Sequence, residues 1–257
     1  EKRFWRNYRM KAIILVAGIG TRLKPLTDNM PKCLTEVNGK SILSNMLEQL
    51  DSVGVEEAIL VIGYFGNQIK EKIGDKFGNM RISYIENPIY AKTNTSYSLW
   101  LAVKDLYFDG ALLVLEGDVF FEKALLKEFL DDGFLTSTIV QKYKPDLDGS
   151  FVELDGSVVV DWIHKKARPA DFTIEDKFKT VNIYKFDKDF AQYSLIPILK
   201  EHIEEEQGKE PLEYVMQDIV KNRGEKINAF EVGKLKWFEI DDIKELKIAE
   251  KIFEEAV

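Results

Sequence analysis

Two glycines, an arginine and two lysines stand close together in LVAGIGTRLKPLTDNMPKCL, residues 15–34. Gly18 and Gly20 allow the backbone to turn tightly and bring N–H groups up to an anion, and Arg22 adds a forked cation. An ordinary strand-to-helix turn would also explain the glycines. The stretch is not GxxxxGK[ST], and Leu23 interrupts a GxGxxG motif, which disfavours ATPase and dinucleotide-binding interpretations. The pattern predicts an anion-binding loop.

Further polar side chains stand at the ends or on one face of predicted elements. Asp118 ends the apolar strand ALLVLEGD, at the carboxyl edge of the sheet, unless it caps the following helix EKALLKEFL. Residues 94–102, NTSYSLWLA, open a helix with groups that suit either capping or a polar ligand. Thr180, Asn182 and Tyr184 share one strand face, where Asn182 could also make purely structural hydrogen bonds.

The elements that carry these residues alternate in type through the first half of the chain. Continuous apolar runs predict strands at residues 10–16, 58–64, 80–86 and 111–118. Helices are predicted after the N-cap residue Ser41, near 66–77 and near 95–107. The alternation predicts an α/β fold: a Rossmann-like, mostly parallel mixed sheet flanked by helices, with ligands at the carboxyl ends of its strands.

Beyond residue 132 strands become more frequent. They are predicted at 136–143, 150–154, 157–163, 179–186 and about 227–232, with a tight Asp155–Gly156 turn between the second and third. Helices are predicted near 189–206, 211–222 and 242–254. Because no Ser/Gly/Pro-rich linker separates the halves, we expect a single domain over 10–257 with a small β-rich insertion covering the mouth of the first half. Residues 1–9 are a native arm, a linker from an upstream domain or an added segment.

Composition excludes several classes of partner. The 257 residues carry 36 basic and 44 acidic side chains, and no basic stretch is long enough to follow a nucleic-acid backbone. The single cysteine, Cys33, excludes an internal disulfide, and two histidines are too few for a histidine metal site or a hydrolytic triad. No apolar stretch reaches membrane-spanning length. We expect a cytoplasmic protein that binds neither nucleic acid nor membranes; a homodimer stays open.

Residues 15–34 resemble the signature LAAGxGxRLxPLTxxxPKxL of the nucleotidyltransferases that join a nucleoside triphosphate to a sugar phosphate or an alcohol phosphate. Val16 departs from the signature and Cys33 fills a variable position, and neither change involves a charge. The resemblance extends from Met10 to about Phe253 and includes WFEIDD, which is similar to the family's WxEIDD element. It implies the nucleotide-diphospho-sugar transferase fold.

The resemblance also implies roles for individual residues. Lys32 and Arg22 would be catalytic, although Lys32 alone could be a solvated surface lysine. Asp118 and Asp241 would bind Mg²⁺, with Asp242 as the alternative to Asp241. The implied nucleotide-binding set is Val16, Ala17, Gly18, Gly20, Thr21, Arg22, Tyr90, Asn94, Ser96 and Ser98, with Asn87 and Pro88 as neighbouring candidates. The implied acceptor-binding set is Asn182, Thr180, Glu213 and Lys166, although the basic pair Lys165 and Lys166 could simply be solvated.

Within this family the compact chain favours cytidylyltransferases that act on phosphocholine or on phosphonates such as 2-aminoethylphosphonate. We expect Mg-dependent transfer of CMP from CTP to a small phosphate or phosphonate acceptor, with release of pyrophosphate. Only Tyr143 and Phe151 offer an aromatic cage for a quaternary ammonium, so an amine held by carboxylates such as Asp146, Asp148 or Glu213 is equally compatible. The alternatives are a sugar-1-phosphate uridylyl- or thymidylyltransferase and a non-catalytic nucleotide-binding regulator.

Overall fold

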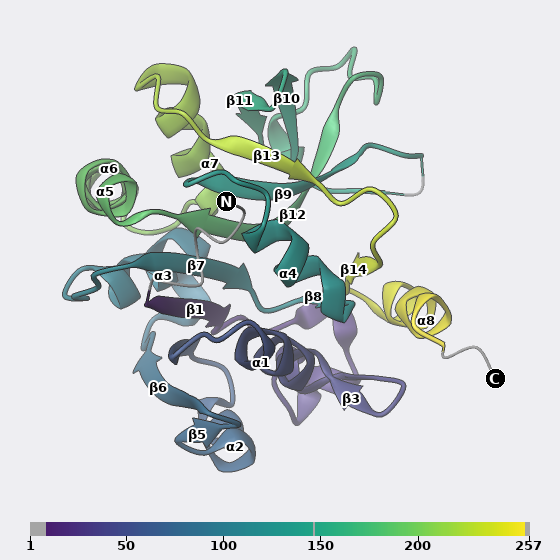
Figure 1. Ribbon diagram of the computed structural model, residues 1–257. Coiled ribbons are helices and arrows are strands. Elements are labelled where there is room, and N and C mark those ends of the chain that lie inside the picture. The colour runs from purple at the N-terminus through teal and green to yellow at the C-terminus, as the bar shows by residue number, and fades with distance from the viewer. Residues whose placement is uncertain (1–8, 146, 255–257) are drawn as a thin grey trace.

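The residues described by the computed structural model, 9–145 and 147–254, form a ten-stranded mixed sheet flanked by helices (Figure 1). Its strands are β1 (Met10–Val16), β4 (Glu57–Ile62), β5 (Lys76–Phe77), β6 (Met80–Glu86), β7 (Ala111–Glu116), β9 (Ser137–Lys142), β10 (Phe151–Asp155), β11 (Val158–Ile163), β12 (Phe178–Phe186) and β13 (Asn228–Glu231). Across the sheet their order is β10, β11, β13, β9, β12, β7, β1, β4, β6 and β5. Asp146 and residues 1–8 lie outside the described residues.

The four apolar runs of the first half form the parallel part of the sheet. β1 pairs in parallel with β4 on one side and β7 on the other, and β4 pairs in parallel with β6. Their carboxyl ends therefore meet at one edge, as the alternation of strands and helices predicts. The four predicted strands correspond closely to β1, β4, β6 and β7.

Helices cover both faces of the sheet. Successive apolar residues of β1 point to opposite faces, so both faces must be buried. Ala12 and Ile14 belong to the core on one face, whereas Ile13 and Leu15 belong to the core on the other. Burial of one such isoleucine stabilises the fold by roughly 1.5–3 kcal/mol. The first core includes residues of α1 (Ile42–Ser52), α2 (Gly66–Ile73), α4 (Lys123–Leu130) and α8 (Ile243–Ile252). The second includes residues of α3 (Thr95–Val103), α6 (Ile196–Glu206) and α7 (Leu212–Gln217).

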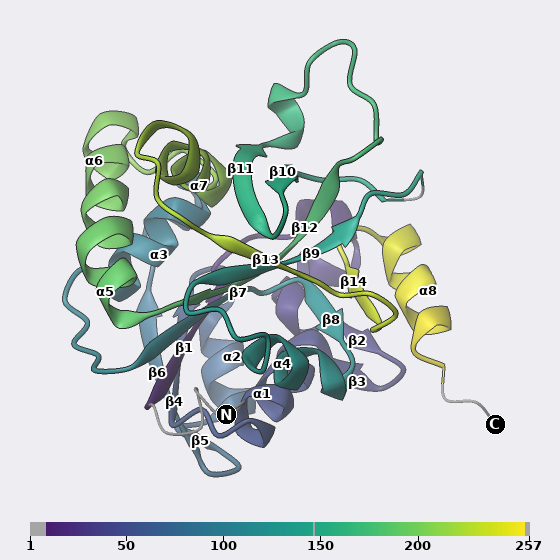
Figure 2. The same ribbon diagram turned by 45° about the horizontal axis from the view of Figure 1, so that its top comes forward.

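The strands of the second half extend this sheet mostly in antiparallel fashion, although β13 pairs in parallel with β9. β12 pairs antiparallel with both β7 and β9, and β10 and β11 form the hairpin predicted around the Asp155–Gly156 turn. Figure 2 shows this hairpin beside α7, at one end of the sheet. The helix predicted near 189–206 begins with α5 (Lys188–Phe190) and a π-helical turn, Ala191–Leu195, before α6. Pro197 lacks the N–H that a regular helix would need there.

A bulge interrupts β12 where it faces the carboxyl ends of the parallel strands. The register between β12 and β9 shifts between Thr180 and Tyr184, and Asn182 adopts a left-handed conformation with φ of 62°. Asparagine tolerates this conformation better than most residues, because its short polar side chain hydrogen-bonds locally. Here the Thr180 hydroxyl donates to Asn182 Oδ1 over 2.9 Å. The bulge thereby turns the Asn182 amide group toward the end of the sheet.

Two short ribbons and the helix caps complete the framework. β2 (Glu36–Val37) pairs with β3 (Lys40–Ser41), and β8 (Val119–Phe121) pairs with β14 (Trp237–Glu239). Ser41 caps α1 as predicted, accepting from the Ser44 N–H. Asp242 caps α8 in a capping box with Glu245, and α4 begins after Glu122, so Asp118 is not its N-cap. Among the described residues, no helix has the length and apolar character needed to cross a membrane.

Candidate active site

A cleft of about 360 Å³ lies at the carboxyl ends of the parallel strands. Most residues of the predicted nucleotide, catalytic and metal sets line it: Val16, Ala17, Gly18, Gly20, Thr21, Arg22, Lys32, Tyr90, Asn94, Ser98, Asp118 and Asp241. Asn87, Glu116 and Gly117 also contribute to its wall. The fold thus brings together side chains from both ends of the chain.

The loop after β1 needs a glycine at position 20 to bring Lys32 into this cleft. Gly20 has φ of 67°, and a Cβ atom there would lie only 2.8 Å from Lys32 Cβ. The carbonyl of Gly20 accepts from the Leu23 N–H at 3.0 Å and from the Thr27 hydroxyl at 2.8 Å. Pro31 then starts the short turn Lys32–Leu34. The loop is consequently ordered by its own hydrogen bonds, and its three basic side chains, Arg22, Lys24 and Lys32, all pair with acids.

The β8–β14 ribbon brings the two ends of the chain to one point. Glu239 stands opposite Val119, and the Ile240 N–H donates to the carbonyl of Asp118 over 2.9 Å. Asp118 therefore precedes one strand of the ribbon and Asp241 follows the other. Asp118, Glu239 and Asp241 each offer a carboxylate oxygen within 4.8 Å of the others.

Two cations, Lys32 and Arg22, pair with the two aspartates of this cluster. Lys32 Nζ lies 2.9 Å from Asp118 Oδ2 and 2.5 Å from Asp241 Oδ1, and Arg22 lies 2.6 Å from Asp241 Oδ2. Burial alone would lower the pKa of Lys32, but the two carboxylates more than reverse this and raise it. Burial alone would raise the pKa of Asp241, but the neighbouring Lys32 and Arg22 outweigh burial and lower it.

The acidic cluster fits a hard divalent cation. Asp118 Oδ1 is buried and has no hydrogen-bond partner among the described residues. A buried carboxylate oxygen without a donor is costly, and a metal ion would satisfy it. Three carboxylates from two segments are also the oxygen donors that Mg²⁺ prefers. Asp118, Asp241 and Glu239 are thus the residues that could hold such an ion.

One end of the cleft is built from the loop before α3. The buried Asn87 amide donates to Thr93 Oγ1 at 3.1 Å and to Ser98 Oγ at 3.2 Å. Asn94 is the N-cap of α3, and Tyr90 lines the wall nearby. Ser96, in contrast, does not line the cleft, because its hydroxyl is buried and donates to the backbone carbonyl of Glu210. On α3 it lies two residues from Ser98 and so points to another side of the helix.

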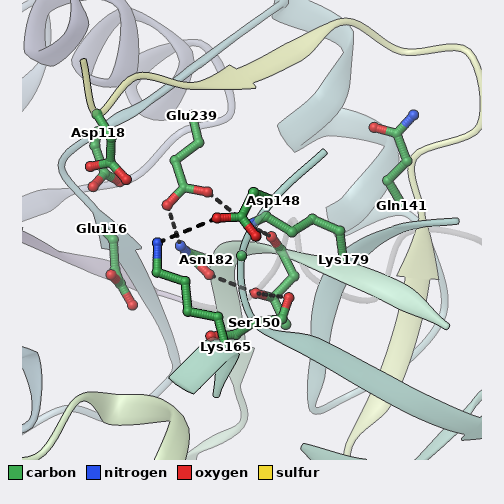
Figure 3. Close-up of polar contacts among 12 residues, drawn as sticks. Glu116, Asp118, Gln141, Asp148, Ser150, Lys165, Lys179, Asn182 and Glu239 are labelled. Atoms are coloured by element: carbon green, nitrogen blue, oxygen red, sulfur yellow. Dashed lines mark hydrogen bonds and ion pairs between the residues drawn. The ribbon is translucent and has the colours of Figure 1, made fainter. Parts of the chain in front are cut away.

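A second polar group adjoins the carboxylate cluster (Figure 3). Asn182 Nδ2 lies 3.4 Å from Glu239 Oε1, and Thr180 is fully buried beneath Asn182. Glu213, in the first turn of α7, accepts from the Ser150 hydroxyl at 2.8 Å. Of the predicted acceptor-binding residues, Lys166 alone is exposed and makes no side-chain contact with this group. Its neighbour Lys165 is the lysine that faces the group, 3.8 Å from Asp148.

A model of the nucleotidyl transferase family matches residues 11–246. The chain belongs to this family. Its sequence is 30% identical to the CMP-5'-(3-aminopropyl)phosphonate synthase of Streptomyces rubellomurinus over 91% of this chain and 37% of that protein. It is 34% identical to a UTP–glucose-1-phosphate uridylyltransferase of Haloferax volcanii over 43% of this chain and 44% of that protein. The chain therefore spans less than half the length of these two relatives.

Solved structures of the family share the fold. The CTP:phosphocholine cytidylyltransferase of Streptococcus pneumoniae superposes with a TM-score of 0.73 and 25% sequence identity. The match covers 96% of this chain and the whole of that one. The nucleotide-diphospho-sugar transferase fold implied by residues 15–34 is therefore confirmed.

Three residues of this family member were not singled out by the sequence: Glu116, Lys179 and Glu239. Glu116 accepts from the Tyr184 hydroxyl at 3.3 Å, and the buried Lys179 lies 2.7 Å from Glu239 Oε2. Burial raises the pKa of Glu116 well above its ordinary value, and the nearby acids, with Glu213 the strongest, add to the effect. A signal was present, because Glu116 and Glu239 stand two positions before Asp118 and Asp241. In extended chain that spacing puts both members of a pair on one side.

Proposed function

We propose that the chain transfers CMP from CTP to a small phosphate or phosphonate acceptor that carries a cationic amine, and releases pyrophosphate. One observation carries the proposal: the cleft joins a glycine loop and Lys32 to the carboxylates of Asp118 and Asp241, and a further group of acids, Glu116, Glu213 and Glu239, adjoins them. The first part suits a metal-bound triphosphate, and the second suits a small cationic acceptor. Both parts lie at the carboxyl edge of the sheet, where ligands of open α/β folds bind.

In this mechanism the residues position the two substrates and neutralise their negative charge. The N–H groups of the loop from Gly18 to Arg22 bind the phosphates, and Lys32 neutralises the charge that develops at the α-phosphorus. An acceptor oxygen forms a bond to that phosphorus while the bond to the β-phosphate oxygen breaks, and pyrophosphate leaves with the electron pair. The acceptor is already anionic near neutral pH, so no general base is needed. Mg²⁺ held by Asp118 and Asp241 would supply further charge neutralisation.

The acidic group of Glu116, Glu213 and Glu239 supports an acceptor with a positive charge. Glu116, Glu213 and Glu239 approach closely enough that each of the other two raises the pKa of Glu116. The repulsion within such a group of like charges is reduced when an ammonium ion binds among them. Lys165 faces the same acidic group from the loop after β11 and could pair with the acceptor phosphate or phosphonate (Figure 3). The substrates named for the two cytidylyl-transferring relatives, an aminopropylphosphonate and phosphocholine, both carry a cationic nitrogen.

The test is pyrophosphate release with Mg²⁺, four nucleoside triphosphates and a panel of acceptors. We expect turnover with CTP and with 2-aminoethylphosphonate, 3-aminopropylphosphonate or phosphocholine, and little with ethylphosphonate, which lacks the amine. Turnover with UTP and glucose 1-phosphate would instead favour a sugar-1-phosphate uridylyltransferase. CTP binding without pyrophosphate release for any acceptor would favour a regulator.

Glu213→Gln is the matched variant for the cationic end of the acceptor. A hydrogen bond to a charged group contributes roughly 1.5–3 kcal/mol, so the KM of an amine-bearing acceptor should rise about 10-fold or more. The small turnover with ethylphosphonate should not change. An equal effect on both acceptors would show that Glu213 does not recognise the amine.

A further inference from the structure

Asp241 is paired on both of its carboxylate oxygens with cations of the chain itself. Oδ1 lies 2.5 Å from Lys32 Nζ, and Oδ2 lies 2.6 Å from Arg22. The same Lys32 ammonium lies 2.9 Å from Asp118 Oδ2, so it bridges the two acids. The Lys32 side chain is 15% exposed, and water therefore screens this bridge only weakly.

The bridge and a divalent cation need the same oxygens. A metal ion between Asp118 and Asp241 would approach their oxygens at about 2.0–2.6 Å. The Lys32 ammonium would then stand within a few ångströms of a double positive charge, where the repulsion is strong in a partly buried site. Lysine and metal can therefore not both occupy the space between these carboxylates.

The geometry points to an exchange of cations, and we propose that Lys32 is a displaceable internal counterion. In the substrate-free protein its ammonium neutralises Asp118 and Asp241. It leaves them when a divalent cation binds, and it is then free to pair with the triphosphate. The inference rests on the proposed function, since it takes Asp118 and Asp241 as the metal ligands. It follows that the substrate-free protein binds divalent cations weakly, and that a triphosphate attracting Lys32 and Arg22 strengthens their binding.

The experiment is a Mn²⁺ titration followed by electron paramagnetic resonance, in the absence of nucleotide and acceptor. Lys32→Met removes the bridging charge, and we expect it to bind Mn²⁺ about 10-fold or more tightly than the wild type. Lys24→Met is the matched control on the same loop, because Lys24 pairs with Asp28 on the surface; its Mn²⁺ affinity should equal that of the wild type. Lys32→Gln is a second, polar replacement for which we expect the same gain.

Asp118→Asn, added to Lys32→Met, locates the ion. If the gain arises between the two carboxylates, the double variant loses it. Equal Mn²⁺ affinity in the wild type and both Lys32 variants, or a gain that survives Asp118→Asn, would overturn the exchange. Pyrophosphate release by the wild type is measured on the same preparation and tests the reaction separately. A gain in Mn²⁺ affinity without any pyrophosphate release would leave the exchange standing and refute the proposed reaction.

Discussion

Replacing Lys179 by methionine should strongly destabilise the fold. The Lys179 side chain is 2% exposed, and its ammonium lies 2.7 Å from Glu239 Oε2 and 2.8 Å from the carbonyl of Thr180. Burial raises the pKa of Glu239, and Lys179 offsets this only in part because Asp118 and Asp241 repel the same carboxylate. Without Lys179 the Glu239 carboxylate, whose side chain is only 21% exposed, keeps no cationic partner among the described residues and only the 3.4 Å contact with Asn182. Removing one partner of such a pair costs about 3–5 kcal/mol, out of a typical free energy of unfolding of about 5–15 kcal/mol.

Urea denaturation followed by tryptophan fluorescence measures this loss. Lys177→Met is the matched control, because Lys177 pairs with Glu153 at side-chain exposures of 24% and 41%; it should cost no more than about 1 kcal/mol. The double variant Lys179→Met/Glu239→Gln removes both charges and should recover about 1–3 kcal/mol relative to the sum of the single losses. Metal-free buffer with chelator keeps added cations from compensating Glu239.

Two results would refute this reasoning. If Lys179→Met costs no more than Lys177→Met, the buried pair does not hold Glu239 in the charged state. If the double variant loses the full sum of the single losses, the two side chains are not coupled.

Three shorter predictions address the cleft and the acceptor side. Lys32→Ala should lower turnover at least 100-fold with an unchanged far-ultraviolet circular dichroism spectrum; near-normal rates would remove Lys32 from the catalytic set. Burial raises the pKa of Cys33 to about 12, so at pH 8 roughly one thiol in ten thousand is ionised, and thiol reagents should react quickly only after unfolding; rapid labelling of the native protein would contradict this. Burial opposes ionisation of Asp161, but hydrogen bonds from Gln217 and Lys221 lower its pKa, so Asp161→Asn should reduce the melting temperature most at neutral pH. That difference should shrink as the pH falls below the ordinary carboxyl pKa and through the lowered pKa of Asp161, and a difference that stays constant with pH would show that the charge is not responsible.

The parallel part of the fold could be predicted because most of its strands consist of mainly apolar runs. Such runs as residues 10–16 are buried on both faces, and the intervening helices force a parallel arrangement. The antiparallel pairing of β12 with β7 could not be predicted, because the residues of a strand do not indicate which other strand it will pair with. The π-helical turn Ala191–Leu195 could not be predicted, because helical periodicity does not reveal how the missing N–H of Pro197 is accommodated.

For the candidate site, the motif of residues 15–34 predicted the position of the cleft better than any single residue did. The loop residues and Asp118 line it together, since the ends of parallel strands meet in space. The side chain of Ser96 turns away because one helix can present only part of its first turn to a ligand. Of the adjacent lysines, Lys165 is the better candidate for acceptor binding, because it is less exposed and faces the acidic group. The sequence HKKAR does not reveal the burial or the direction of either side chain.

The bulge at Asn182 limits which substitutions are tolerated at this predicted acceptor-binding residue. Its positive φ admits glycine, asparagine and aspartate readily and penalises β-branched and bulky residues. Most other residues at this position would therefore destabilise the fold by about 1–2 kcal/mol, and this loss would be mixed with their effect on acceptor choice. A mutant library meant to alter acceptor preference should keep position 182 to those three residues and place its diversity at Lys165 and Glu213, whose backbone conformations impose no such restriction.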